Sequence, residues 1–425
     1  MNISHKIELI PNKIGREYFA KAFGCARLAY NWGLSRWKEL HEQGINRNAL
    51  AIKKDFNSIK EEVFPFVYEV SKYVTQQPFI QLNLAITKFF RDLKAGVVSY
   101  PKHKKKGRDK DSFYMGGDVV EIHDGKYLKI PKLDKIKMTE NLRFNGKITG
   151  AVISRHSDRY YASIQVEITE EEYKRTHKIK EITDEKIVGI DVGISSLMTM
   201  SNGIKIGNIK AFSKETKKLV RLQRQLSRKQ HAKTKQDVLK GVKASNNYTK
   251  QAKKVAKKYQ RISNIRKDYI NKVTGVITNH FTHIALEELD VEGMLRNHKL
   301  AREISDVSFY EIKRQIIYKA ENKGRNVYDV DKYYPSSKKC SNCGNIDVNL
   351  KLSTRVYRCK NCGYTIDRDL NAGINLKYEI ENIIGKVLPE LTPVDLTALL
   401  EDLAINHIAT SKVEAGIQTF EVIDI

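Results

Sequence analysis

The first part of the chain has hydrophobic residues at helical spacing. A short strand is expected over residues 7–10, and a helix is predicted to follow Pro11, because apolar residues then recur at steps of three and four. A second helix with the same spacing is predicted after Pro78. The two apolar faces consist of Phe19, Phe23, Ala26, Tyr30, Leu34 and Trp37, and of Phe79, Leu82, Ile86, Phe89 and Leu93. We therefore expect a small helical domain, with Cys25 as a packed thiol beside the first face.

The hydrophobic period changes to two between residues 112 and 172, which is typical of half-buried strands. Asp158-Arg159 lies at a predicted turn back to a strand over residues 148–154, and His123-Asp-Gly125 and Asn145-Gly146 predict two more hairpins. The strand after the turn has its apolar residues at Ala162, Ile164, Val166 and Ile168. Several short strands at this spacing predict a small barrel. The charged segment 170–185 is expected to be a connector.

A third region begins with an apolar strand that ends in Asp191, followed by a glycine turn and a returning strand. After a long helical stretch, a second buried strand begins at His283 and ends in Glu287. A helix over residues 309–320, a third strand over 326–331 and a closing helix over 369–380 complete the pattern. From Gly385 onward the apolar residues are scattered, so we expect a poorly ordered tail.

The charge of the chain indicates the kind of partner. Hydrophobic residues make up 41% of the sequence and charged residues 30%, which is typical of a globular protein. The start of the chain does not read as a signal peptide, and no apolar run reaches the length of about 18 residues that spans a membrane, so we expect a cytoplasmic protein. The net charge of +26 favours a polyanion, most commonly nucleic acid. The alternative is a protein that lysine merely keeps soluble.

Positive charge gathers in two places, which favours the nucleic-acid interpretation. Residues 100–110 form a basic segment with Pro and Gly, either a solvated linker or a phosphate-contacting loop. Residues 214–272 hold twenty Lys/Arg and three Asp/Glu, and their apolar spacing predicts a helical hairpin with one packed face. Candidate nucleic-acid contacts in these segments are Lys102, Lys104, Lys105, Lys106, Arg224, Arg228 and Lys229.

Four of the five cysteines have the spacing of a zinc site. Cys340 and Cys343 enclose two residues, as do Cys359 and Cys362, and fifteen residues separate the pairs. Four thiolates complete a tetrahedral shell and leave no open position, so the predicted zinc is structural. The alternative of reduced cysteines or two disulfides is less favourable, because no secretory segment is recognisable.

Three acidic residues stand at the ends of predicted elements. Asp191 and Glu287 each end a strand, and Asp369 opens the closing helix. Each alone is more often a turn or capping residue. Together, the element order predicts a ribonuclease-H-like sheet in which the three carboxylates converge to bind two Mg²⁺ or Mn²⁺ ions for phosphodiester hydrolysis. Spacing alone does not choose between Glu287 and Glu288 or between Asp367 and Asp369.

A series of motifs resembles the TnpB family, transposon-encoded RNA-guided nucleases related to the compact type V CRISPR effectors. The motifs cover nearly the whole chain from Lys6 to Leu376, whereas the last fifty or so residues match only loosely. They are Phe23-Gly-Cys-Ala-Arg27-x-x-Tyr30-Asn-Trp32, Tyr100-Pro-Lys-x-Lys-Lys105, Asp191-Val-Gly-Ile, Leu222-Gln-Arg-x-Leu-Ser-Arg-Lys229, Leu286-Glu-Glu-Leu289, Pro335-Ser-Ser-Lys-Lys-Cys340-Ser-Asn-Cys343-Gly, Cys359-x-x-Cys362-Gly and Asp367-Arg-Asp-Leu-Asn-Ala372.

The resemblance implies a multidomain α/β fold. It consists of a wedge β-barrel with an inserted helical recognition domain, then a RuvC-like nuclease with a zinc ribbon before its last helix. The implied ranges are 1–12 and 111–182 for the barrel, 13–110 for the recognition domain, 183–213 and 273–384 for the nuclease, 214–272 for a basic helical hairpin within it, 333–366 for the ribbon, and 385–425 for a tail without an assigned role.

The resemblance also implies the activity and the partners. It assigns catalysis to Asp191, Glu287 and Asp369. The expected partners are a guide RNA (omega RNA) from the transposon end and double-stranded target DNA beside a short motif, and the expected products carry 5′-phosphates. A prokaryotic, nucleoid-associated monomer is favoured. Two alternatives are a nuclease-inactive RNA-guided regulator, disfavoured because all three acids are present, and a ribonuclease-H-like transposase, disfavoured by the N-terminal half.

Overall fold

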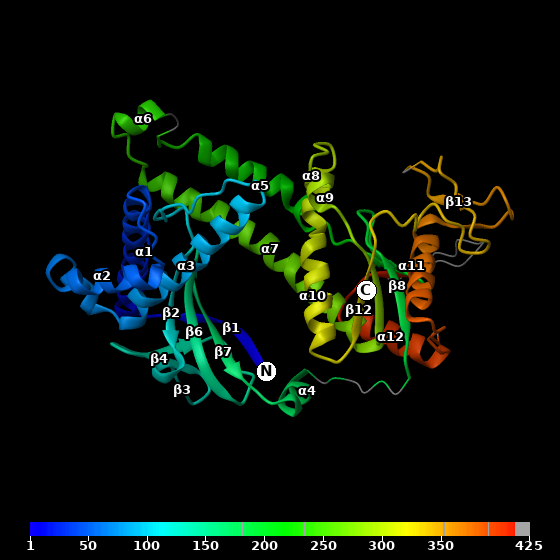
Figure 1. Ribbon diagram of the computed structural model, residues 1–425, viewed down its shortest axis with the longest axis horizontal. Coiled ribbons are helices and arrows are strands. Elements are labelled where there is room, and N and C mark those ends of the chain that lie inside the picture. The colour runs from blue at the N-terminus through cyan, green and yellow to red at the C-terminus, as the bar shows by residue number, and fades with distance from the viewer. Residues whose placement is uncertain are drawn as a thin grey trace. The chain divides into compact units, whose positions relative to one another are not determined.

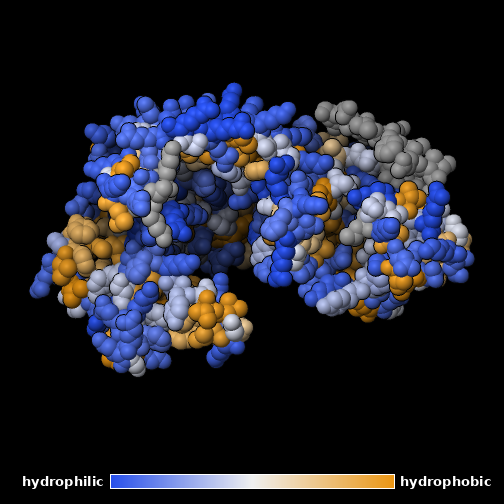
Figure 2. Space-filling view, turned by 90° about the horizontal axis from the view of Figure 1, so that it is seen from above, coloured by the Kyte–Doolittle hydropathy of each residue, from blue (hydrophilic) through white to orange (hydrophobic). Residues whose placement is uncertain are grey.

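The computed structural model describes residues 1–177, 179, 182, 184–232, 235–351, 353–389 and 391–412. The chain divides into two compact units, Met1–Lys178 and Ile179–Ile425 (Figure 1). Among the described residues, no helix has the length and apolar character needed to cross a membrane. The face of the molecule shown in Figure 2 is mostly hydrophilic, with apolar residues confined to separate patches.

The first unit combines three long helices with one antiparallel sheet. Its helices are α1 (Lys13–Glu42), α2 (Ala49–Val63), α3 (Lys72–Lys94) and α4 (Glu170–His177), with short 3-10 turns at η1 (Pro65–Glu69) and η2 (Gly117–Val119). Its strands are β1 (Asn2–Ile10), β2 (Asp111–Gly116), β3 (Glu121–His123), β4 (Tyr127–Ile130), β5 (Leu133–Met138), β6 (Lys147–His156) and β7 (Arg159–Glu167).

The sheet of the first unit is open. Its seven strands pair in the order β2-β6-β7-β1-β5-β4-β3, and β1 lies between β7 and β5 although it comes first in the chain. No ladder joins β2 to β3 in the part of the chain that the structure describes, so the strands do not close into the small barrel predicted from the sequence. The β3–β4 hairpin at Asp124-Gly125 and the β6–β7 hairpin at Ser157-Asp158 are confirmed.

Two further predictions for this unit were wrong. Asn145-Gly146 does not join two paired strands, because β6 pairs with β7 and β2 and not with β5. Helix α3 begins at Lys72, before Pro78, and contains that proline in its second turn. The residues before the proline are held in the helix by burial, since Val74 and Thr75 pack inside the unit.

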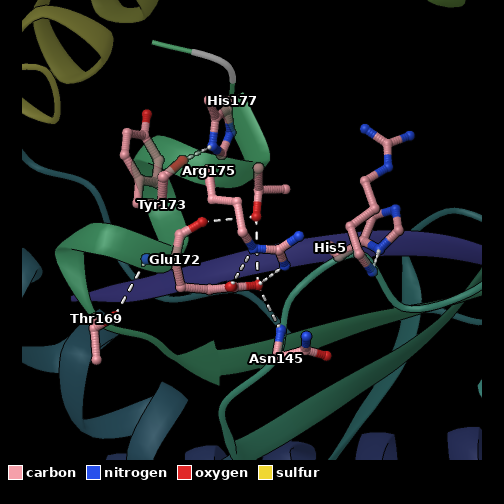
Figure 3. A network of polar contacts seen from close by, with 9 residues as sticks. His5, Asn145, Thr169, Glu172, Tyr173, Arg175 and His177 are labelled. Carbon is pink, nitrogen blue, oxygen red and sulfur yellow. Dashed lines mark hydrogen bonds and ion pairs between the residues drawn. The ribbon is translucent and has the colours of Figure 1, made fainter.

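Residues 170–177 form helix α4 rather than a simple connector (Figure 3). The Thr169 hydroxyl accepts a hydrogen bond from the backbone amide of Glu172. The Glu172 carboxylate accepts two hydrogen bonds from the Arg175 guanidinium, at 2.8 and 2.9 Å, and one from the backbone amide of Asn145, at 3.0 Å. The Arg175 side chain and that amide lower the pKa of Glu172 to about 2. The buried ring of Tyr173 fixes the helix against the unit.

The second unit is a mixed sheet between helices, followed by a small ribbon. Its sheet strands are β8 (Ile187–Asp191), β9 (Ser196–Met200), β10 (Ile204–Gly207), β11 (His283–Glu287), β12 (Asn326–Val330) and β15 (Thr410–Lys412), and the ribbon strands are β13 (Val356–Arg358) and β14 (Thr365–Asp367). Its helices are α5 (Ala211–Ser227), α6 (Lys235–Leu239), α7 (Asn246–His280), α8 (Val291–Leu295), α9 (Ala301–Val307), α10 (Phe309–Glu321), α11 (Arg368–Ile384) and α12 (Pro393–Ile405).

The strand order is β12-β11-β8-β9-β10-β15, in which β12, β11 and β8 are parallel and the rest antiparallel. One face packs on α7, α10 and α12 through a large core that includes Val188, Ile190, Ile284 and Leu286. The opposite face packs on α11 through Ile187 and Ala285, and Figure 1 shows α10 and α11 on opposite sides of the strands. Because successive residues of a strand point to opposite faces of the sheet, the side chains at the strand ends that lie two residues after Gly189 and Ala285 face α11.

Pro393–Ile405 and Thr410–Lys412 form α12 and β15, which corrects the prediction of a disordered tail for this part of the chain. Helix α12 begins with a capping box between Thr392 and Asp395, and Leu399 and Leu403 are completely buried in the main core. His280 of α7 lies 2.7 Å from Asp402, and β15 adds a strand beside β10. The sequence pattern missed this because α12 carries only a narrow buried stripe. Residues 413–425 lie outside the described residues.

Glycine permits an unusually close approach of α11 to β8. A Cβ placed at Gly189 would lie 2.0 Å from the carbonyl oxygen of Gly373 and 2.6 Å from the amide nitrogen of Lys377. Both obstacles are backbone atoms that cannot rotate away. Any larger residue at position 189 would therefore push α11 off the sheet.

We expect Leu399→Ala to lower the free energy of unfolding by about 2–5 kcal/mol, because it opens a cavity in the core shared by α12 and the sheet. Urea unfolding of the purified protein measures this. The matched control is Val394→Ala on the same helix, where the side chain is 79% exposed and a change within about 0.5 kcal/mol is expected. Equal stability of the two variants would contradict the docked position of α12.

Gly189→Ala is expected to destabilise the protein by about 1–3 kcal/mol or more, because the methyl group overlaps the backbone of α11. Gly275→Ala is the control, since its Cβ would meet only the Lys319 Nζ at 3.8 Å and alanine is favoured inside α7. Thermal unfolding of both variants tests the contact. A Gly189→Ala protein as stable as Gly275→Ala would show that α11 does not pack this closely.

Candidate metal and nuclease centre

The two acidic strand ends lie side by side on the α11 face. β8 and β11 are parallel neighbours with Ile190 opposite Leu286, so Asp191 and Glu287 end adjacent strands at the same edge. Gly189 and Ala285, two residues before them, face α11, and the period of two places both acids on that face. Glu288 has the opposite parity and lies after the strand end, exposed.

Asp369 lies in the first turn of helix α11, and Asp367 is the N-cap residue of that helix. The Asp367 carboxylate caps the helix by accepting the amides of Asp369 and Leu370 at 3.0 Å each. Its other oxygen lies 2.8 Å from the Lys205 Nζ of β10. Asp369, in the first turn, instead lies 3.1 Å from the Arg368 guanidinium. Asp367 is thus occupied as the helix cap, and the charge of Asp369 raises the pKa of Asp191 more than the charge of Asp367 does.

The charges of Asp369 and Glu287 act on Asp191. Burial, followed by the negative charges of Asp369 and Glu287, raises the pKa of Asp191 to about 7. Burial also raises the pKa of Glu287. Clustered carboxylates of this kind are stabilised in their charged form by cations, and oxygen donors suit Mg²⁺ or Mn²⁺.

Carboxylate oxygens are donors of the kind that divalent cations prefer, but those of Asp191, Glu287 and Asp369 do not all lie within 4.8 Å of one another, as the ligands of a single ion would. Within the described ranges, only the four cysteines form a group of three or more potential ligands whose donor atoms all lie within 4.8 Å of one another. A two-ion site, with the ions roughly 3.5–4 Å apart, needs carboxylates spread over a wider space. The arrangement of Asp191, Glu287 and Asp369 is consistent with that requirement.

The four-cysteine site is formed by two similar turns. The Cys340 Sγ lies 3.7 Å from the Cys362 Sγ, and the Cys343 Sγ lies 3.5 Å from the Cys359 Sγ. Sulfur atoms bound at about 2.3 Å to a tetrahedral zinc ion are roughly 3.8 Å apart, so the donors fit zinc. In each turn a glycine amide donates to the first cysteine carbonyl, at 2.9 Å for Gly344 and 3.0 Å for Gly363. Both glycines have positive φ, which favours glycine there.

Two buried asparagines, which the sequence analysis did not single out, join this site to α11. The Asn371 side chain accepts the amide of Ser341 at 3.0 Å and donates to the carbonyl of Lys339 at 2.7 Å. Asn375, one turn further on, donates to the same carbonyl at 2.6 Å and to that of Ser336 at 2.8 Å. Their spacing of four residues beside the apolar stripe of the helix is the signal that could have identified them.

The candidate basic residues differ in how exposed their side chains are. Lys104 is not free: its amide and carbonyl bond to the Asn31 side chain at 2.7 and 2.9 Å, and its Nζ lies 4.1 Å from the centre of the Tyr30 ring. Burial lowers its pKa. By contrast, six of the candidate contacts are exposed: Lys102, Lys105, Lys106, Arg224, Arg228 and Lys229. The structure thus gives Lys104 a role in holding the basic loop on α1.

The helical hairpin predicted over residues 214–272 is formed by α5 and α7. Leu219 of α5 and Val255 and Ile262 of α7 make up its buried seam. The Gln251 side chain donates to the Leu222 carbonyl at 3.1 Å, and Lys258 pairs with Glu215. Tyr259, at helical spacing from Val255 and Ile262, is 43% exposed and accepts a hydrogen bond from the Gln223 side chain.

Comparison with known families and proteins gives consistent matches along the chain. Residues 309–376 match the family described as "Cas12f1-like, TNB domain", residues 163–298 the family described as "Probable transposase", and residues 1–46 the family described as "Helix-turn-helix domain". The last description does not fit the structure, where these residues form β1 and the single helix α1 before a turn.

Two bacterial relatives cover most of the chain. InsQ of Escherichia coli (strain K12), whose name provisionally gives it as an RNA-guided DNA endonuclease, is 30% identical over 373 residues, 83% of this chain and 86% of InsQ. A Streptomyces pristinaespiralis protein with the same provisional activity is 30% identical over 365 residues, 84% of each chain. A solved Cas12f1–sgRNA–target DNA complex shares the fold, with a TM-score of 0.51 at 14% identity over 87% of this chain and 83% of that one.

We expect Cys340→Ala to lose the bound zinc and to lower the midpoint of thermal unfolding, because metal binding supplies folding free energy to the ribbon. Elemental analysis and a thermal scan measure the two effects. Cys25→Ala is the control, since Cys25 is buried in α1 and lies outside the cluster. Full zinc content in the Cys340→Ala protein would contradict the assignment of the site.

Proposed function

The chain belongs to the TnpB family of RNA-guided DNA endonucleases, and we propose that it is itself a metal-dependent endonuclease directed to double-stranded DNA by a guide RNA. The observation that carries this proposal is the meeting of Asp191, Glu287 and Asp369 at one sheet edge, from two parallel strands and one helix. That arrangement supports the assignment of these three residues as catalytic metal ligands.

Asp191, Glu287 and Asp369 would hold two divalent cations, which would supply an activated water and charge stabilisation of the leaving oxygen in an in-line displacement at phosphorus. The chain's own residues hold the carboxylates in place for this reaction. β8 and β11 fix Asp191 and Glu287 at adjacent strand ends, and the Asp367 cap with its Lys205 ion pair fixes the first turn of α11. Arg368 offsets part of the negative charge of Asp369. The products would carry 5′-phosphates.

The partners follow from family membership. The guide RNA would come from the transposon end, and the protein would read a short flanking DNA motif while base pairing reads the rest. The exposed cations of residues 102–106 and of α5 would hold the nucleic-acid backbone, because phosphate contacts need charge and not base identity. The first unit would act as the wedge and recognition part, and the second as a RuvC-like nuclease with an inserted structural zinc.

Asp191→Asn, Glu287→Gln and Asp369→Asn should each lower the rate of guided cleavage by on the order of 10³-fold or more, because each removes a ligand from one cooperating cluster. Binding of the guide and target should persist, since the backbone contacts are elsewhere. Cleavage of a plasmid matching the guide, in Mg²⁺, and gel-shift binding measure both properties.

Glu321→Gln is the control for these substitutions, because Glu321 is exposed at the far end of α10. A variant of the three that cleaves at the control rate would remove that residue from the assignment. Wild-type protein that binds guided DNA without cutting it would indicate a regulator. Joining of DNA ends to the target instead of hydrolysis would indicate a strand-transfer enzyme.

A further inference from the structure

A cavity of about 360 Å³ adjoins the proposed nuclease centre. It lies beyond the carboxyl ends of the parallel strands, and Glu287 forms part of its wall. Sites at this edge of a sheet are where ligands bind in open α/β folds. Glu287 is the residue that the cavity wall shares with the proposed centre, whereas Asp191 and Asp369 do not line the cavity. A molecule in the cavity would therefore adjoin the centre at Glu287.

The floor of the cavity is apolar, and its rim carries an exposed aromatic ring. Leu286, Phe309 and Ile312 line it and are at most 4% exposed, whereas Tyr310 is 74% exposed. The contrast between Phe309 and Tyr310 arises at a sharp corner, because Ser308 adopts a left-handed conformation with φ of 62° between α9 and α10. This corner directs one ring into the core and leaves its neighbour at the mouth of the cavity.

The charges of the rim exclude a phosphate as the occupant. Four acids line the cavity, Glu287, Glu288, Asp290 and Glu292, and its one lysine, Lys313, pairs with Asp329 at 2.9 Å. An anion would be repelled there. A neutral, flat molecule with N–H donors is complementary, since its faces match the apolar walls and its donors match the carboxylates. A nucleobase has these properties.

We propose that this cavity receives a nucleobase of the DNA strand that is being cut, with the Tyr310 ring stacked on its face. The proposal rests on the proposed nuclease function and deepens it by naming what the site binds besides the scissile phosphate. The base must leave its helical stack to enter, so the bound strand is single-stranded at the cut. Stacking accepts any base, which suits an enzyme whose sequence is read by its guide.

The test combines Tyr310 variants with abasic DNA. Guide-loaded wild-type protein and the Tyr310→Ala, Tyr310→Phe and Tyr378→Ala variants are given target DNA with one abasic nucleotide, placed in turn at each position around the wild-type cut. Single-turnover cleavage rates at saturating protein separate the reaction from target binding. Tyr378 is the control because it is an exposed tyrosine on α11 that does not line the cavity.

With the wild type, an abasic nucleotide next to the cut should slow cleavage by about 5- to 150-fold, and other positions should have little effect. Tyr310→Ala should slow cleavage of intact DNA by a similar factor and show no added loss at that abasic position. Tyr378→Ala should cleave at the wild-type rate, and Tyr310→Phe, which keeps the ring that stacks, should recover most of the rate that Tyr310→Ala loses. The midpoint of thermal unfolding should not change, because Tyr310 is exposed.

Wild-type rates with Tyr310→Ala would overturn the proposal and leave the nuclease function standing. The proposal would also be overturned if Tyr310→Ala slowed the cleavage of intact DNA and of abasic DNA by the same factor, so that the losses from the variant and from the missing base added. The cavity would then hold another occupant, such as a second copy of the chain. If the wild-type protein cuts no guided DNA at all, the proposed function fails, and this inference fails with it.

Discussion

The close contact between β8 and α11 is the constraint on which the second unit depends. Gly189 and Gly373 present no side chains to one another, so the helix backbone rests directly on the strand. The period of two then brings Asp191 to the α11 face, and the parallel neighbour β11 brings Glu287 beside it. The helix must begin at this edge for Asp369 to join them. A shift of α11 by even one side-chain layer would separate the three carboxylates.

The same helix joins the four-cysteine cluster to the proposed nuclease centre. Its first turn carries Asp369, and two positions later Asn371 bonds to the backbone on both sides of Cys340, at Lys339 and Ser341. Leu370 packs in the core of the ribbon with Tyr357 and Ile366. The zinc ribbon thus holds the start of α11 from one side while β8 holds it from the other. Zinc bound to the four cysteines would therefore contribute to the position of Asp369, which it would not itself contact.

Local pattern predicted most of this centre, and longer-range packing accounts for the rest. Buried strands ending in acids and the paired Cys-x-x-Cys turns are visible in the sequence because each depends on neighbouring residues. The role of Asp367 as a cap was not decided by spacing, since it depends on where α11 begins and on Lys205 from a distant strand. Helix α12 was missed for the same kind of reason, because its buried leucines meet a core formed by other segments.

The second unit has an acidic sheet edge and a strongly basic hairpin. The sheet edge carries Asp191 and Glu287, while the α5–α7 hairpin has an apolar seam and, over residues 214–272, twenty Lys/Arg against three Asp/Glu. Such a hairpin is destabilised by its own repulsion until a polyanion neutralises it. The acidic centre repels the same polyanion unless metal ions are bound. In the proposed function, the nucleic-acid backbone would therefore bind on the hairpin, and only the metal-loaded centre would accept the phosphate that is to be cut.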